Sequence, residues 1–307
     1  MSQPGWPAVT LCIPTFRRPQ GLRKLLEHVG RLTYRGKLSV LVVENDAEER
    51  AGEAVVRTVM RAFPFPLTCI VEPRRGQTYA YNRAFAGACG SKPDYVAVLD
   101  DDEYPEPGWL TAMIEAAVAN RADIVGGPVF PVFEDSGHWL SASGLYEPRR
   151  YPSGRVDMIY GAGNMLIRRD VLAHYLDEPF SNAFAFTGGS DFDFFTRCRR
   201  DGRSFAWADE ARVRETVPRS RTSVAWLLRR GFRNGTDRTR IDRRFARGTG
   251  RTMRRWLKGV GLMAYGMASL PLAVFRGRCA AVGSLIEAAR GAGRIAAEFG
   301  IIYEEYR

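Results

Sequence analysis

The stretch VAVLDDDEYPEPGWL, residues 96–110, sets four consecutive acidic residues directly after an apolar run. Residues 95–99 have the length and composition of a buried β-strand, and Pro107 suits the first position of the helical pattern that follows. Neighbouring carboxylates raise one another's pKa and destabilise a fold unless a cation or a strong donor neutralises them. The stretch therefore predicts a strand that ends at a charged site and is followed by a helix.

Three similar pairs of segments precede this stretch. Apolar runs of strand length alternate with helical spacing at residues 9–13 and 22–32, 38–43 and 51–62, and 67–71 and 78–88. Four such units in about 120 residues predict a doubly wound α/β fold, in which a mostly parallel sheet is flanked by helices. Further short strands are expected at residues 129–133 and 165–167.

Polar segments follow the four predicted strands: residues 14–17, 44–46, 74–77 and the acidic run. Ligands of doubly wound sheets bind outside the carboxyl ends of the strands, so these segments should line one pocket. The sequence has neither a Gly-x-Gly-x-x-Gly after the first strand nor a Gly-x-x-x-x-Gly-Lys, which argues against a common dinucleotide site and a P-loop. We expect a ligand that has a metal-bridged anionic part and a polar ring.

Asp100 and Asp102 are two residues apart at the end of the fourth predicted strand. If the strand continued, alternation would place both on one side and Asp101 on the other. Mg²⁺ and Mn²⁺ prefer carboxylate oxygens and complete their coordination with water and substrate phosphates. The spacing therefore predicts a divalent metal site, Mg²⁺ or Mn²⁺, at Asp100 and Asp102.

A second acidic site lies in GGSDFDFFTRCRRDG, residues 188–202. Asp191 and Asp193 open a predicted helix whose apolar face contains Phe194, Phe195 and Cys198. Carboxylates in a first helical turn also interact favourably with the helix dipole, so a purely structural role for both stays open.

The composition is that of a folded globular protein, with 45% hydrophobic and 26% charged residues among 307. Its net charge of +11 is concentrated in residues 212–258, which contain 16 basic and three acidic residues. The five cysteines form no Cys-x-x-Cys and are expected to be buried thiols in a reducing compartment. Residues 1–10 lack the pattern of a secretory signal, so a cytoplasmic location is expected.

The last third differs from the rest of the chain. Residues 226–233 predict a basic helix, 236–251 a charged connection, and 286–299 an amphipathic helix. Between them, residues 259–275 carry no charge, and 17 residues is the lower limit for spanning a bilayer. Pro271 and several glycines favour a helix or helical hairpin that lies in a membrane interface, attracted to anionic lipid by the basic segment. A helical tail packed on a catalytic core is the alternative.

Five sequence blocks together resemble the family 2 glycosyltransferases with the GT-A fold: CIPTFRRPQGL, VVENDAEE, RGQTYAYNRAF, VLDDDEYPEPGWL and SDFDFFTRCRRDG. The resemblance covers roughly residues 8–235. It extends to GAGNMLIRR and ETVPRSRTSVAWLLRRGFRNG, which are similar to the bacterial branch that builds exopolysaccharides of the succinoglycan type. A GT-A domain over residues 1–235 and a helical, membrane-associated tail over 236–307 are therefore expected.

The resemblance implies roles for individual residues. The implied nucleotide-binding residues, together with two neighbours in the predicted pocket, are Pro14, Thr15, Arg17, Glu44, Asp46, Gly76, Asn82, Asp100 and Asp101. Among them, Asp46 would accept the imide N–H of a uracil, and Asp102 would ligate a metal that bridges the two phosphates. Asp191 would be the general base. The glutamate that precedes this aspartate in the family is replaced by Ser190, which leaves its acceptor-binding role open.

The implied activity is an inverting, metal-dependent transfer of a sugar from a nucleotide-diphosphate sugar, expected to be a UDP-sugar. The implied acceptor is a hydroxyl of a glycan or a lipid-linked molecule in cell-surface polysaccharide synthesis, with the enzyme peripheral on the inner face of the bacterial cytoplasmic membrane. A nucleotidyltransferase acting on sugar phosphates is a weaker alternative, because IPTFRRPQG is a poor triphosphate loop. A nucleic-acid-binding protein is weaker too, since residues 212–258 contain few aromatic side chains, and no nucleic-acid partner is expected.

Overall fold

The computed structural model describes residues 5–135, 139–245 and 248–304. The chain divides into two compact units. The first, called the sheet unit below, comprises Met1–Phe130, Pro148–Ala185 and Ser190–Glu215. The second, called the helical unit, comprises Pro131–Glu147, Phe186–Gly189 and Thr216–Arg307.

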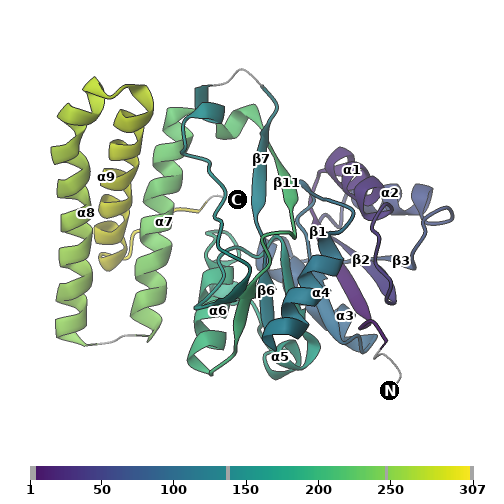
Figure 1. The fold of residues 1–307 in the computed structure, drawn as a ribbon. Coiled ribbons are helices and arrows are strands. Elements are labelled where there is room, and N and C mark those ends of the chain that lie inside the picture. The colour runs from purple at the N-terminus through teal and green to yellow at the C-terminus, as the bar shows by residue number, and fades with distance from the viewer. Residues whose placement is uncertain (1–4, 136–138, 246–247, 305–307) are drawn as a thin grey trace. The chain divides into compact units, whose positions relative to one another are not determined.

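An eight-stranded sheet with the order β3-β2-β1-β4-β9-β6-β10-β8 forms the sheet unit (Figure 1). Its strands are β1 Val9–Thr15, β2 Leu38–Glu44, β3 Leu67–Val71, β4 Tyr95–Val98, β6 Ile124–Gly126, β8 Gly154–Val156, β9 Met165–Arg168 and β10 Phe205–Trp207. The first four strands are parallel, as predicted. Strand β9 enters antiparallel between β4 and β6, and β8 is antiparallel to β10.

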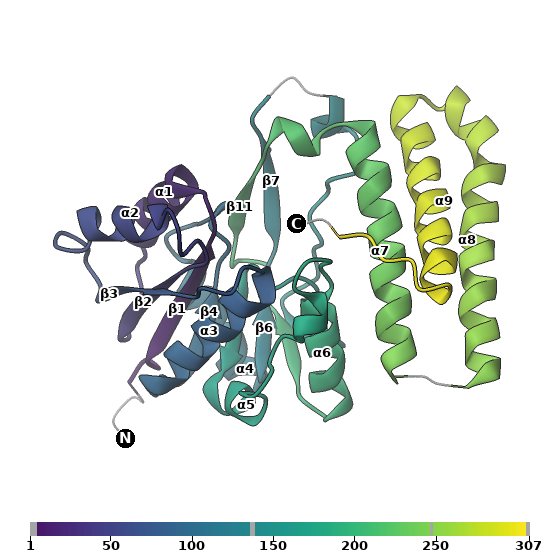
Figure 2. The same cartoon turned by 180° about the vertical axis from the view of Figure 1, so that it is seen from behind.

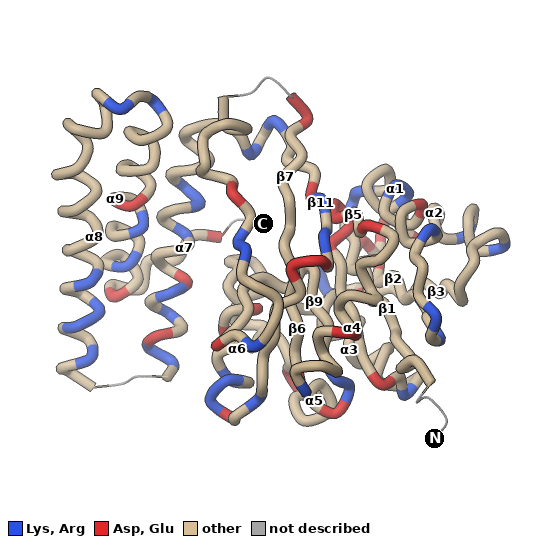
Figure 3. The backbone as a smooth tube through the Cα atoms, in the orientation of Figure 1, with Lys and Arg blue, Asp and Glu red and all other residues tan. Residues whose placement is uncertain are grey.

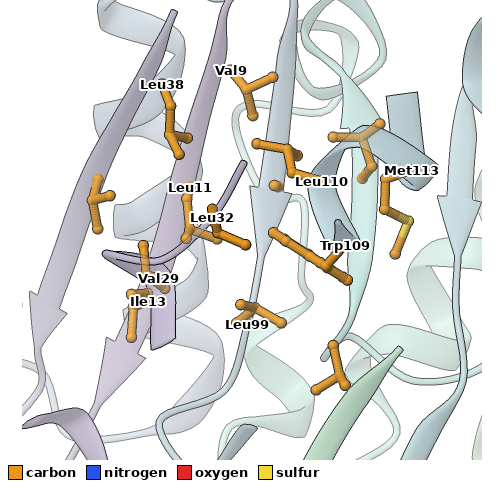
Figure 4. Packing of buried hydrophobic residues seen from close by; sticks show 14 of the residues in the cluster. Val9, Leu11, Ile13, Val29, Leu32, Leu38, Leu99, Trp109, Leu110 and Met113 are labelled. Atoms are coloured by element: carbon orange, nitrogen blue, oxygen red, sulfur yellow. The ribbon is translucent and has the colours of Figure 1, made fainter. Parts of the chain in front are cut away.

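Helices cover both faces of this sheet, with α4 towards the viewer in Figure 1 and α3 and α6 in Figure 2. They are α1 Pro19–Val29, α2 Ala51–Val59, α3 Gln77–Gly90, α4 Trp109–Asn120, α5 Arg169–His174 and α6 Ser190–Arg200, with a 3-10 turn at Asn182–Phe184. Two apolar cores result because β-strand side chains alternate between faces. Leu11 and Ile13 pack with α1 and Trp109 of α4 in one core (Figure 4), whereas Cys12 packs with α3 in the other.

The acidic run does not continue the fourth strand. Strand β4 ends at Val98, and the Glu103 N–H donates a 3.0 Å hydrogen bond to the Asp100 carbonyl, which closes a turn. The expectation that strand alternation places Asp100 and Asp102 on one side is therefore wrong. Helix α4 begins at Trp109 after Gly108, so the expected start at Pro107 is also wrong, because the chain first forms a turn from Glu106 to Trp109.

A second, three-stranded sheet with the order β5-β11-β7 begins at Glu103, where the turn of the acidic run ends. It contains β5 Glu103–Pro105, β7 Val129–Phe133 and β11 Val213–Val217. Antiparallel pairing places Glu103 of β5 opposite Glu215 of β11. The turn is thus held between two sheets.

Three long helices make up most of the helical unit: α7 Val224–Phe245, α8 Thr249–Phe275 and α9 Arg278–Glu298, with 3-10 turns at Trp139–Ala142 and Arg219–Arg221. Helix α7 continues to Phe245 and α8 begins at Thr249, so the connection expected at residues 236–251 is wrong for 236–245 and 249–251, while residues 246–247 lie outside the described residues. The expected boundary after residue 235 falls inside α7. Helix α8 includes Pro271 and covers the uncharged residues 259–275. It is the one helix in the described chain with the length and composition to cross a membrane.

Glycines bring α8 and α9 into backbone contact. A Cβ added at Gly266 would lie 2.5 Å from the Ala288 nitrogen and the Ser284 carbonyl oxygen of α9. A Cβ at Gly291 would collide with the backbone of Met263. Small residues at such positions allow two helix backbones to approach closely.

All five cysteines are free thiols. Cys12 and Cys198 are buried as expected, whereas Cys69, Cys89 and Cys279 are partly exposed, so the expectation of five buried thiols is wrong for these three. Burial raises the pKa of Cys198 to about 12, which keeps its thiol protonated and unreactive near neutral pH.

Candidate active site

The candidate site begins where β1 and β4 lie side by side, the position at which the order of the sheet reverses. Cys12 of β1 pairs with Val98 of β4, and continuing this parallel register by three residues brings Thr15 level with Asp101. The Thr15 hydroxyl donates a 2.8 Å hydrogen bond to Asp101 Oδ2, and the Phe16 N–H lies 3.4 Å from the same oxygen. Asp101 therefore joins the ends of the two strands, at the crevice where doubly wound folds bind ligands.

Arg18 adds a positive charge to this corner. Its Nη1 lies 3.1 Å from Asp101 Oδ1 and 2.5 Å from Asp102 Oδ2. Arg18 precedes α1, whose first turn is packed on the acidic run: a Cβ at Gly21 would lie 2.7 Å from the Asp101 carbonyl oxygen. The contact holds the guanidinium next to both carboxylates.

Asp100 accepts a hydrogen bond from the Tyr81 hydroxyl of α3. Burial raises the pKa of Asp100 to about 7, and the charge of Asp102 adds to this effect. Burial also raises the pKa of Asp101 to about 6, although the charge of Arg18 opposes the shift. Glu103 is buried, accepts a 3.0 Å hydrogen bond from the Asp100 N–H, and has a pKa well above the ordinary value, chiefly because of burial. Burial and mutual repulsion thus hold the pKa values of Asp100, Asp101 and Glu103 above their ordinary values.

This donor set fits a hard divalent cation that binds few protein ligands. The part of the chain that the structure describes contains no group of three or more His, Cys, Asp or Glu side chains that could hold a metal ion. Carboxylates of Asp100 and Asp102 could supply one or two oxygens, and Mg²⁺ commonly takes its remaining ligands from water and substrate phosphates.

The ends of β2 and β3 lie next along the same edge. Asp46 is buried and accepts a 2.6 Å hydrogen bond from Arg17 Nε, and this bond lowers the pKa of Asp46. Glu44 accepts hydrogen bonds from the Asp46 and Gly52 N–H groups at 2.9 and 2.6 Å. The Glu44 carboxylate is therefore engaged in bracing the strand end and the start of α2.

Gly76 and Asn82 lie on the third loop and on α3. Gly76 has a φ of 139°, a backbone conformation that side chains disfavour, and its N–H donates a 3.0 Å hydrogen bond to Asn45 Oδ1. Asn82 exchanges hydrogen bonds of 2.7 and 2.8 Å with the backbone of Phe180. Asn82 therefore stabilises the wall of the site through the loop that contains Phe180. Pro14, another predicted site residue, is buried in β1.

Asp191 lies in the first turn of α6. Its neighbour Asp193 is fully buried and pairs with Arg197 at 3.0 Å, whereas Asp191 is only partly buried. Burial and the negative charges of Asp100 and Asp191 raise the pKa of Tyr81 well above its ordinary value. The Tyr81 hydroxyl thus contacts the first acidic site and lies within electrostatic range of the second.

Two residues of this arrangement were not identified from the sequence, Arg18 and Tyr81, and Asn45 was included only as part of the polar segment 44–46. Asn45 joins the second and third loops, since its amide also donates to the carbonyl oxygens of Glu72 and Arg74 at 3.0 and 2.8 Å. Helical spacing from Thr78, which is also buried, could have indicated that Tyr81 faces the sheet. The partner of Arg18 lies more than 80 residues away, and no local pattern indicates it.

The chain resembles known proteins in sequence and in fold. Residues 10–176, more than half of the chain, match the model of "Glycosyl transferase family 2". The chain is similar to the succinoglycan biosynthesis protein ExoM of Rhizobium meliloti (strain 1021), at 32% identity over 237 residues that cover 76% of this chain and 74% of ExoM.

Solved structures with a similar fold include the mannosyltransferase PcManGT of Pyrobaculum calidifontis in complex with GDP-Man and Mn²⁺, with a TM-score of 0.63 and 17% identity over 97% of this chain and 91% of that one. S. aureus TarS 1–349 in complex with UDP has a TM-score of 0.53 and 13% identity over 97% of this chain and 93% of its own. The chain therefore belongs to glycosyl transferase family 2 and is a glycosyltransferase with the GT-A fold.

Proposed function

We propose that the protein transfers a sugar from a nucleotide-diphosphate sugar, with UDP as the expected nucleotide, to a hydroxyl of a glycan or lipid-linked acceptor in cell-surface polysaccharide synthesis. The similarity to a succinoglycan biosynthesis protein supports the pathway class. The observation that carries the proposal is Tyr81, which hydrogen-bonds to Asp100 and lies in electrostatic range of Asp191. These two interactions of Tyr81 support a donor site and a general base that lie in one region of the sheet unit.

The donor would lie along the carboxyl edge of the sheet. The proposed nucleoside pocket is formed by the ends of β1 and β2, where Arg17 and Asp46 form an ion pair, and by the backbone at Gly76. In this pocket Asp46 would accept the imide N–H of the base. The diphosphate would extend towards Asp100 and Asp102, and Asp101 would hold the two strand ends in register through Thr15.

A divalent cation, Mg²⁺ or Mn²⁺, would supply positive charge that stabilises the departing diphosphate. Asp102 and Asp100 are the residues proposed to hold it. The protein's own contribution is to exclude water and to orient the carboxylates, Asp100 through Tyr81 and Asp102 through Arg18 in the absence of the ion.

Asp191 is proposed as the general base that removes the proton of the acceptor hydroxyl, a contribution of about 10²–10⁴-fold in rate. Attack on the face of the sugar opposite to the diphosphate inverts the anomeric carbon in a single displacement. Asp193 cannot share this role while it is fully buried in its pair with Arg197.

Nucleotide release from a panel of UDP- and GDP-sugars with Mn²⁺ tests the donor proposal, with an added acceptor hydroxyl as the second variable. We expect a UDP-sugar to be turned over and the release to stop when the metal is chelated. Turnover of GDP-sugars alone would contradict the choice of nucleotide, and full activity in excess chelator would contradict the metal.

We also propose that the helical unit binds an anionic membrane from the cytoplasmic side. Along α8 the buried residues are Arg255, Gly259, Gly266 and Ala273, a single seam towards α9. The exposed residues of the helix include Arg251, Arg254 and Lys258 in its first ten residues and a larger set of apolar side chains: Met253, Trp256, Leu257, Met263, Tyr265, Met267, Leu272, Val274 and Phe275. The five free thiols suit the reducing side of the membrane.

The packing of α9 supports a helix that lies on the membrane and does not span it. Charges occur along the length of α9, whereas the charges of α8 lie only in its first ten residues (Figure 3). Ala288 packs on Gly266 in the middle of α8, next to the pair of Glu287 and Arg290, whose charged atoms are 2.7 Å apart. A spanning α8 would carry this pair to the centre of the bilayer, at about 3 kcal/mol for each charge. The pair of helices therefore has a largely apolar surface on α8 and a more charged one on α9, as expected for helices that lie in a membrane interface.

Flotation with vesicles tests this part of the proposal. We expect binding to vesicles that contain anionic lipid, loss of binding at high salt and no binding to oligonucleotides. Release from the vesicles by carbonate or high salt separates a peripheral protein from a spanning one, which would stay in the bilayer. Oligonucleotide binding without vesicle binding would favour the nucleic-acid alternative for this segment.

A further inference from the structure

We infer that Arg18 is an internal counter-ion of the acidic corner, and that a divalent cation must displace it from Asp102 in order to bind. The inference rests on the metal site of the proposed function. It concerns a residue to which neither the family resemblance nor the comparisons assign a role.

The geometry makes Arg18 and a cation competitors for the same oxygen. One nitrogen, Nη1, bridges the two carboxylates, at 3.1 Å from Asp101 Oδ1 and 2.5 Å from Asp102 Oδ2. An ion coordinated by Asp102 Oδ2 would share that oxygen with the guanidinium and place two positive charges within a few ångströms of each other. Such like charges repel each other, which favours departure of the guanidinium.

The two carboxylates are held differently. Asp101 has an 8% exposed side chain and two more donors, the Thr15 hydroxyl and the Phe16 N–H, so it keeps hydrogen bonds when Arg18 leaves. The Asp102 side chain is 15% exposed and that of Arg18 is 43% exposed, so both can move towards solvent. The bond from Arg18 to Asp102 joins the two more exposed side chains and is therefore the one that we expect to open.

The permanent positive charge of arginine explains why this residue type suits position 18. An arginine stays protonated at all accessible pH values, so it is a permanent counter-charge for a corner with four acidic residues in sequence. When displaced, its planar donors match a diphosphate oxygen pair. Nucleotide would then recover the interaction that the cation removes, which makes metal binding weak alone and stronger with nucleotide.

Manganese binding without nucleotide measures this competition directly, by the EPR signal of free Mn²⁺. We expect Arg18→Gln to bind Mn²⁺ about tenfold more tightly than the wild type, equivalent to about 1.4 kcal/mol. Arg23→Gln is the matched control, because it removes the same charge from an exposed position on α1 that has no place in the proposed site. Its Mn²⁺ affinity should stay within about twofold of the wild type, as expected for a charge that does not contact the ion's ligands.

Thermal unfolding gives a second readout. Metal-free Arg18→Gln should unfold at a lower temperature than the wild type, and Mn²⁺ should raise its Tm by more than it raises that of the wild type. Arg18→Lys, which keeps the charge and loses the planar fork, should bind Mn²⁺ with an affinity between the two and serves if the glutamine variant does not fold. Adding Asp102→Asn to Arg18→Gln should remove the gain.

Each outcome decides between the alternatives. Wild-type Mn²⁺ binding that Arg18→Gln leaves unchanged or weakens would overturn the role of Arg18 and leave the proposed metal site in place. Absence of Mn²⁺ binding in every variant, with and without UDP, would overturn the metal site and this inference together.

Discussion

Tyr81 of α3 donates its hydroxyl hydrogen bond to Asp100 of the acidic turn, 19 residues further along the chain. The Tyr81 ring stacks on Phe180 with centroids 5.0 Å apart, and it is almost completely buried. Aromatic packing therefore orients a hydroxyl group towards a carboxylate proposed to hold a metal. Contacts of this kind, one layer behind a metal ligand, tune the affinity of the site.

Tyr81→Phe tests this relationship. The variant removes one hydroxyl and keeps the stacked ring, so we expect a folded protein with about 10- to 100-fold weaker Mn²⁺-dependent nucleotide binding. Tyr34→Phe is the matched control, because its hydroxyl donates a 2.6 Å hydrogen bond to the Pro7 carbonyl, before the start of β1. Isothermal titration calorimetry with UDP and Mn²⁺ compares the nucleotide affinities of the two variants. Equal affinity in both variants would show that the Tyr81 hydroxyl does not support the site.

Asp102→Ala should abolish transfer and metal-dependent nucleotide binding. The loss of a metal ligand removes several kcal/mol of charge stabilisation, so turnover should fall by at least about 100-fold. Glu106→Ala removes an acidic residue four positions away that lies 3.7 Å from Arg214, and it should retain activity. Nucleotide release at saturating Mn²⁺ is the measurement, and near-normal release by Asp102→Ala would exclude this residue as a ligand.

Asp191→Asn should keep nucleotide affinity and lose turnover by about 10²–10⁴-fold, because the amide cannot accept the acceptor proton. Asp193→Asn provides a contrast on the same helical turn. It breaks a buried pair with Arg197 and should lower the free energy of unfolding by about 3 kcal/mol while the folded fraction stays active. Turnover per folded molecule separates the two, and a fully active Asp191→Asn would disprove the base assignment.

Gly266→Ala and Gly261→Ala form a matched pair on α8. The first places a methyl group 2.5 Å from the backbone of α9, so it should destabilise the helical unit and reduce vesicle binding. The second points where no atom lies within 4 Å and should stabilise the helix by up to about 1 kcal/mol, since alanine is the better helix former. Thermal unfolding and vesicle flotation measure both. Equal stability of the variants would contradict the close packing of α8 on α9.

Acid should reduce the contribution of the Arg17–Asp46 pair to the free energy of unfolding. The Arg17 hydrogen bond lowers the pKa of Asp46 in the folded protein, so between the folded and unfolded pKa values the unfolded chain binds more protons. The stabilisation is complete above the unfolded pKa, about 3.9, and is lost as the pH falls through the lower folded value. The difference in unfolding free energy between wild type and Asp46→Asn should be constant from about pH 5 to 7 and shrink below about pH 4. Urea titrations check this, and a difference that grows in acid would contradict it.

Local sequence patterns were sufficient to predict many of the strands and helices of the sheet unit. The strand at Leu67–Val71 was predicted without error, and the parallel order of the first four strands followed from alternating strand and helix patterns. The position of the acidic run at a carboxyl edge followed as well. These features depend on apolar periodicity and chain connection, which act within a few residues or within one βα unit.

Tertiary structure alone decided the details of the candidate site. Asp101 turned out to join β1 to the acidic turn, Glu44 to brace α2, and Arg18 to bridge Asp101 and Asp102. Propensity also failed to indicate that the acidic run bends into a turn after Val98, because the turn is held by pairing of Glu103 with a strand more than 100 residues away. The partner of a charged side chain depends on which distant segments the fold brings together, and no local pattern carries that information.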